Sequence, residues 1–138
     1  MNMDVRYKRP DTKNAMSILE AARKDMNFTL SMKPSAESGS TIVRNVHECF
    51  RMLGDALLVS KGIEAEDHVL PIKELMKLRV STKRPTILLD NLRRLRHNVN
   101  YYGYQPNLAE VEDVISIAKN CFTPLLEAVR NEIEKRKM

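Results

Sequence analysis

Apolar residues recur at steps of three and four along most of this chain, and this spacing constrains the fold more than any other feature. Between residues 41 and 61 they are Val43, Val46, Phe50, Leu53 and Leu57. Such steps place side chains on one face of an α-helix, because each residue advances by roughly 100° around the axis. Strand-like alternation is absent, and the 138 residues contain only four glycines. The sequence therefore predicts an all-α protein.

The periodic segments predict four long helices and one short one. We expect the long helices over residues 11–31, 41–61, 86–101 and 107–135, and the short one within 64–78. Helices joined by turns favour an antiparallel up-and-down four-helix bundle with an additional short helix. A chain of 138 residues is long enough to bury one core, so we expect a single domain spanning residues 1–138.

Residues at the helix ends agree with this division. Asp11 is a suitable N-cap for the first helix, and Gly62 suits a left-handed C-cap after the second. Asn107, with Glu110 three residues later, resembles a capping box at the start of the last helix. Pro124 should kink that helix or split it.

Composition narrows the environment and the chemistry. Charged residues make up 30% of the chain, and no apolar run approaches the roughly 18 residues of a membrane span. We expect a cytoplasmic protein without a membrane partner, whose Cys49 and Cys121 are buried and reduced. The three histidines are scattered without ligand spacing, so we expect no metal site and no cofactor. His47 reads as a residue flanking the apolar seam of its helix, and His68 as a capping or packing residue of the short helix.

Basic residues are concentrated between residues 73 and 96. This span contains eight basic residues and two acidic ones, whereas the whole chain has a net charge of +5. The basic ones are Lys73, Lys77, Arg79, Lys83, Arg84, Arg93, Arg94 and Arg96. A local positive field attracts polyanions such as nucleic acids, although a solvated surface is the more common explanation of a run of charge.

The segment "LRRLRHNVNYYGY", residues 92–104, gathers polar and aromatic residues at the end of the fourth helix. Helical spacing places one set on the packed face: Leu88, Leu92, Leu95, Val99 and Tyr102. A neighbouring stripe contains Arg93, Arg96, His97 and Asn100, while Arg94 and Asn98 point elsewhere. Arg93 and His97 are four residues apart, so both can reach one bound group.

This stripe has a functional and a structural interpretation. Arg93 and Arg96 are suited to bind phosphate, and His97 to act as a general acid or base near neutral pH. Tyr101, Tyr102 and Tyr104 are able to stack on bases. Alternatively, basic residues near a helix C-terminus favour its dipole, and tyrosines there pack with their hydroxyls in water.

The order of these segments resembles the HEPN superfamily of helical-bundle domains. The resemblance covers about residues 41–135 and rests on "GDALLVSKGIEAEDHVLPIKELMKL", residues 54–78, followed by the arginine-rich helix that ends in tyrosines. It implies a homodimer with that helix at the dimer cleft. Many members are metal-independent ribonucleases, some are toxins paired with a small nucleotidyltransferase, and others are inactive binding modules.

The resemblance assigns roles to residues of the fourth helix. Arg93 and Arg96 correspond to the cleft arginines, and Tyr101 or Tyr102 to the terminal tyrosine. Arg93 and His97 are the candidate catalytic residues of a ribonuclease, and the candidate RNA- or phosphate-binding residues are Arg94, Arg96, Asn100 and Tyr101. Only three residues separate Arg93 from His97, one fewer than the usual minimum of the ribonuclease motif. Two alternatives therefore stand: a metal-independent ribonuclease, and a binding or interaction module that has lost the motif.

Overall fold

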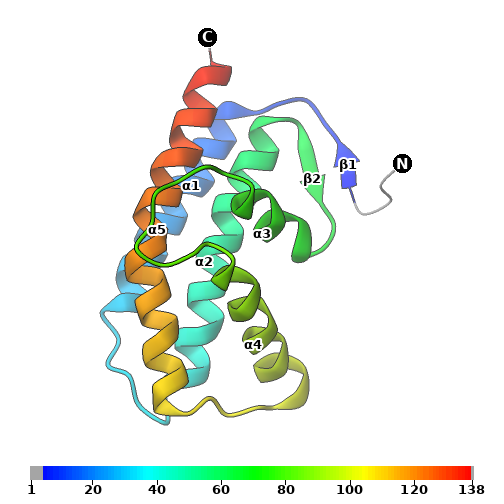
Figure 1. The fold of residues 1–138 in the computed structure, drawn as a ribbon. Coiled ribbons are helices and arrows are strands. Elements are labelled where there is room, and N and C mark those ends of the chain that lie inside the picture. Colours follow the sequence, from blue (N-terminus) through cyan, green and yellow to red (C-terminus); the bar gives the residue numbers. More distant parts are fainter. Residues whose placement is uncertain (1–4, 138) are drawn as a thin grey trace.

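The computed structural model describes residues 5–137 and is mainly α-helical, as the periodicity predicted (Figure 1). In chain order its elements are β1 (Val5–Tyr7), α1 (Thr12–Leu30), α2 (Gly39–Ser60), β2 (Ile63–Ala65), α3 (Val69–Met76), α4 (Leu88–Tyr102) and α5 (Leu108–Arg136).

Helix α2 lies in the centre of the arrangement. It packs on α1, α5, α3 and α4, and α1 also packs on α5. The longer helices α1, α2, α4 and α5 alternate in direction along the chain (Figure 1). Helix α4 packs mainly on α2 and touches α3 and α5 only lightly. One side of α4 is thus attached to the core, and the rest of its surface is available to other molecules.

A small antiparallel sheet is the feature that the sequence analysis missed. Strand β1 pairs with β2, with Val5 opposite Ala65 and Tyr7 opposite Ile63. Strands of three residues are too short to show alternation in a sequence, and these two come from distant parts of the chain. The backbone N–H of Lys8 donates to the carbonyl of Gly62 at 2.7 Å, so the sheet attaches the chain before α1 to the segment after α2.

The helix ends follow the predicted signals. The side chain of Asp11 accepts a hydrogen bond from the N–H of Asn14, and Asn107 and Glu110 form a complete capping box. Gly62 has a φ of 78°, in the left-handed region that glycine tolerates. Pro124 does not split the last helix, which continues from Leu108 to Arg136.

The core joins apolar side chains from all five helices of the described region. Within it, Phe50 and Phe122 meet edge-to-face, with 5.5 Å between their ring centroids. Cys49 and Cys121 are buried free thiols, as predicted. Helix α3 approaches α2 so closely that a methyl group on Gly54 would overlap the carbonyl of Pro71. None of the helices in residues 5–137 combines the length and the apolar character that crossing a membrane requires.

Candidate functional site

Helix α4 presents the predicted apolar face to the core, with one exception. Leu92 and Val99 are buried, and Leu88 and Leu95 pack against the core while half-buried. Tyr102 was expected on this face but is 75% exposed. It stands in the last turn of α4, just before Gly103 turns the chain with a φ of 63°, and its ring lies beside His97 instead. The buried position that the sequence analysis missed is Leu89.

The polar stripe of α4 lines a surface hollow together with the start of α3. The volume of this hollow is about 180 Å³. Its walls are His68, Val69, Arg93, Arg96, His97 and Tyr101. We name it the α3–α4 hollow. It brings together four of the predicted site residues and adds His68, which sequence reasoning had assigned a structural role.

A second hollow lies next to the first along α4. Its volume is about 300 Å³, and it is lined by Arg93, Arg94, His97 and Asn98. Arg94, a predicted phosphate-binding residue, belongs to this second hollow and not to the α3–α4 hollow. Because Arg93 and His97 line both, the two hollows share a wall.

The arginines of α4 differ in whether a nearby carboxylate compensates their positive charge. Asp90 accepts a hydrogen bond from Arg93 Nε at 3.0 Å, and its other oxygen lies 2.9 Å from Arg94 Nη2. Arg96 is half-buried, and no carboxylate of residues 5–137 lies within ion-pair distance of it. Arg96 is therefore the arginine of α4 whose charge is compensated by no carboxylate of the described residues.

Two other candidates lie outside the α3–α4 hollow. The side-chain oxygen of Asn100 accepts a hydrogen bond from Arg44 Nε at 2.9 Å, which ties the end of α4 to the beginning of α2. The hydroxyl of Tyr104 donates a hydrogen bond to Glu110 Oε1 at 2.6 Å and so supports the capping box of α5. Both residues have structural partners, and neither lines the hollow that contains Arg96.

His47 of α2 is a neighbour of this site that the sequence analysis took as structural. Its side chain is 1% exposed, and neither ring nitrogen has a hydrogen-bond partner among the described residues. Burial lowers the pKa of His47 to about 4, and the positive charge of Arg96 contributes. His47 is thus neutral at neutral pH and lies within the electrostatic influence of Arg96.

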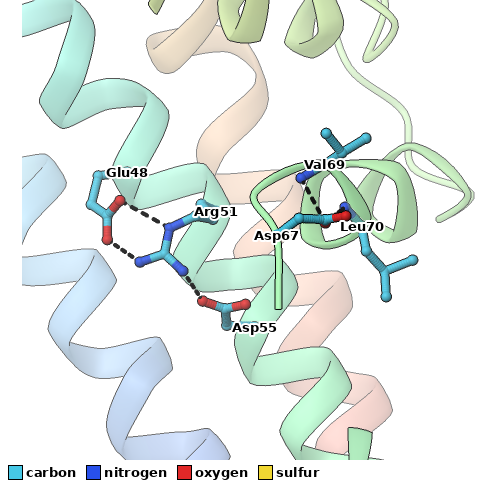
Figure 2. Close-up of polar contacts among 6 residues, drawn as sticks. All are labelled: Glu48, Arg51, Asp55, Asp67, Val69 and Leu70. Carbon is cyan, nitrogen blue, oxygen red and sulfur yellow. Dashed lines mark hydrogen bonds and ion pairs between the residues drawn. The ribbon is translucent and has the colours of Figure 1, made fainter. Parts of the chain in front are cut away.

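His68 occupies the N-cap position of α3 without capping it. Its side chain makes no capping hydrogen bond, whereas Asp67 Oδ1 accepts from the N–H groups of Val69 and Leu70 at 3.1 and 3.0 Å (Figure 2). The imidazole of His68 is therefore available to the hollow. Burial lowers the pKa of His68, and the charges of Arg51 and Arg96 lower it further.

Arg51 of α2 stands between two carboxylates, Glu48 and Asp55 (Figure 2). Burial raises the pKa of Asp55 to about 6, against the opposing effect of the Arg51 charge. The pKa of Glu48 is lowered, mainly by its hydrogen bonds to Arg51. The two carboxylates thus compensate the charge of Arg51, whereas Arg96 has no such partner among residues 5–137.

The basic run between residues 73 and 96 is less positive in space than in sequence. Four of its eight basic residues are ion-paired: Lys77 with Glu74, Arg84 with Asp113, and Arg93 and Arg94 with Asp90. Asp113 lies on α5, outside the run, so counting charges within the run overestimates its field. The described residues offer no ion-pair partner to the other four, which include Arg96.

The α2 side of the site also had a signal in the sequence. Arg44, His47, Arg51 and Asp55 follow one another at steps of three and four and share one side of α2. This polar stripe borders the apolar seam, and its Arg44 contacts Asn100 of α4.

Among residues 5–137, no three histidine, cysteine, aspartate or glutamate side chains converge as metal ligands would.

The fold and the site define a mainly helical protein with an arginine- and histidine-lined hollow between α3 and α4. No protein-family model, curated protein or solved structure matches the chain. The HEPN assignment therefore stays a prediction that rests on the residues quoted for it.

Proposed function

We propose that this protein is a HEPN-like RNA-associated protein, which binds a phosphate of RNA or of a nucleotide at Arg96. One observation carries the proposal: Arg96 is half-buried, lines the α3–α4 hollow and has no acidic partner among residues 5–137. A partly desolvated cation gains most from a charge-assisted contact, and a phosphate offers two oxygens to the guanidinium fork.

The surroundings of Arg96 favour a nucleic-acid ligand over a small anion. His97 and Tyr101 bring aromatic rings to the same hollow, and the second hollow continues it along α4. An elongated ligand that carries both phosphates and bases matches this combination better than a free phosphate does.

A metal-independent ribonuclease is the second candidate function, and one observation favours it. His68 and His97 line the hollow together with Arg93 and Arg96. In such chemistry the RNA 2′-hydroxyl attacks the phosphorus, one imidazole removes its proton, and a second protonates the leaving 5′-oxygen. Arginine stabilises the charge that develops on the phosphate.

The remaining parts of the proposal come from the resemblance alone. They are a homodimer that pairs two α4 helices across a cleft, and a small nucleotidyltransferase as the partner of a toxin-like protein. A two-fold axis near α4 would bring two copies of Arg96 together and double the local positive field.

The binding proposal is tested by the salt dependence of RNA affinity. We expect Arg96→Gln to weaken binding of a fluorescent single-stranded RNA and to reduce the slope of log affinity against log salt by about 1. Arg130→Gln is the matched control, because Arg130 is ion-paired with Glu127 on α5 and its loss changes the net charge equally. Equal affinity of the Arg96 variant and the wild type would refute phosphate binding at this site. RNA affinity that does not change with salt would point to a protein partner instead.

Cleavage is tested separately with EDTA present. If the second candidate is correct, the wild type cuts a structured RNA without metal, and Arg93→Ala or His97→Ala abolishes the cut. If the RNA is bound but stays intact, the ribonuclease candidate fails and the binding function is the one that remains.

A further inference from the structure

We infer that the α3–α4 hollow selects single-stranded RNA, because it holds one unstacked base against the ring of Tyr101 while the adjoining phosphate lies on Arg96. This inference rests on the proposed RNA binding and names the form of RNA that the site takes. It starts from the position of Tyr101 in the last turn of α4.

Tyr101 is exposed and has a neighbouring aromatic ring on the same helix. Its side chain is 64% exposed and forms part of the wall of the hollow. The ring of His97 lies beside it, with 4.7 Å between the ring centroids and 42° between the planes. These residues are four apart on one helix face, so His97 limits the rotation of the tyrosine ring. When another flat ring covers an aromatic surface that is exposed to water in this way, the free energy falls.

Arg96 and Tyr101 together impose a condition on the ligand. Both line one hollow of about 180 Å³, so a phosphate on the guanidinium leaves its own nucleotide beside the tyrosine. In an RNA duplex both faces of each base are covered by neighbouring bases, and recognition proceeds through the backbone and the shallow groove. Only a base that has left its stack can present a face to Tyr101.

The second hollow provides space for the continuation of the strand. It shares Arg93 and His97 with the first and adds Arg94 and Asn98. Arg94 is 69% exposed, so it can exchange its contact with Asp90 for a contact with the next phosphate. A strand that crosses α4 in this direction passes from Arg96 over His97 towards Arg94.

The experiment measures RNA affinity by fluorescence anisotropy for variants of Tyr101. We expect Tyr101→Ala to weaken binding of a single-stranded RNA by about 5- to 150-fold, the effect of losing one base–aromatic stack. Tyr101→Phe keeps the ring and should bind as the wild type does. Tyr7→Ala is the matched control, because Tyr7 is similarly exposed, at 73%, but lies on β1.

Two further ligands separate stacking from an indirect effect of the substitution. On a strand that lacks the base, the wild type and Tyr101→Ala should bind equally, and on a duplex both should bind weakly. A loss in Tyr101→Ala that is the same with and without the base would overturn the inference, as would tighter binding of duplex than of single strand. If Tyr101→Ala binds normally while Arg96→Gln does not, the stacking inference fails and the proposed function stands. If Arg96→Gln also binds normally, the proposed function itself fails.

Discussion

The buried ring of His47 on α2 lies close enough to the guanidinium of Arg96 on α4 for that charge to lower the pKa of His47. Burial is the larger cause, and together the two effects bring this pKa to about 4, from an ordinary value of 6.5. The relationship links the core to the proposed phosphate site, because the charge of Arg96 acts on a residue that is buried in the core. Glu48, His68 and Arg51 are the other charged or titratable groups that face His47.

His47 should make the protein less stable in mild acid. Between about pH 4 and pH 6.5 the unfolded chain binds more protons at this residue than the folded chain, so its contribution to stability rises with pH. At about pH 5 this amounts to roughly 2 kcal/mol of stability lost relative to neutral pH. We expect His47→Leu to remove this loss, because leucine fills the space without an ionisable group. Urea unfolding at a series of pH values measures it.

Asp55 acts in the same pH range with the opposite sign and serves as the control. Its pKa is raised to about 6 from an ordinary 3.8, so the folded state binds the extra proton there, and stability falls as pH rises between these values. In Asp55→Asn the stability should therefore rise more steeply with pH than in the wild type. In His47→Leu it should rise less steeply with pH than in the wild type between about pH 4 and pH 6. Parallel pH profiles for both variants would contradict these assignments.

Asp90 should restrain the affinity of α4 for RNA. Its carboxylate is shared by Arg93 and Arg94, which line the two hollows. We expect Asp90→Asn to tighten RNA binding at low salt and to increase the salt slope by about 1, because a freed arginine gains a phosphate contact. The helix itself should lose about 0.5 kcal/mol, since Asp90 stands in its positively polarised first turn.

The same salt titration shows whether this account of Asp90 is correct. Weaker binding by Asp90→Asn would mean that the carboxylate orients the two arginines for the ligand and does not compete with it. Asp113→Asn, which releases Arg84 at a place away from both hollows, provides the comparison.

Gly54→Ala should damage both stability and binding. The added methyl group would overlap the Pro71 carbonyl, and this neighbour is backbone, so α3 itself has to move away from α2. Overpacking of this kind costs about 1–3 kcal/mol. His68 precedes Pro71 at the start of α3, so the wall of the hollow should move as well, and RNA affinity should fall in the protein that remains folded. Unchanged affinity would show that the position of α3 is not important for the ligand.

Asn107→Ala should affect stability alone. The substitution removes the acceptor for the N–H of Glu110 at 2.8 Å and opens the capping box of α5, which costs about 1 kcal/mol. We expect a lower urea midpoint with RNA affinity unchanged, because Asn107 lines neither the α3–α4 hollow nor the second hollow beside it. A fall in RNA affinity at full folding would show that the end of α4 depends on this cap.

The sequence predicted those features that depend on neighbours within one helix. The caps at Asp11 and Asn107 and the buried positions Leu92 and Val99 follow from local spacing, and the structure confirms them. The polar stripe of α4 was placed for the same reason, and most of it lines one hollow.

Contacts between distant elements explain what the sequence did not predict. The approach of His68 to Arg96 depends on how α3 packs against α2, and the β1–β2 pairing joins segments on either side of two long helices. The exposure of Tyr102 depends on where α4 ends relative to its neighbours, which helical spacing cannot specify. The two ion pairs of Asp90 could have been predicted from the sequence, because Arg93 and Arg94 follow Asp90 at three and four residues.

The one-sided attachment of α4 also determines how the molecule can fluctuate. Helices α1, α2 and α5 contact one another, so they can stay packed together while α4 separates from α2. Amide protons of α4 should therefore exchange with solvent by local opening, at a lower free energy than those of α2. A bound strand that spans Arg96 on α4 and His68 before α3 would join the two sides of that opening. Hydrogen exchange in α4 would then slow on RNA binding, and this protection would locate the ligand without any substitution.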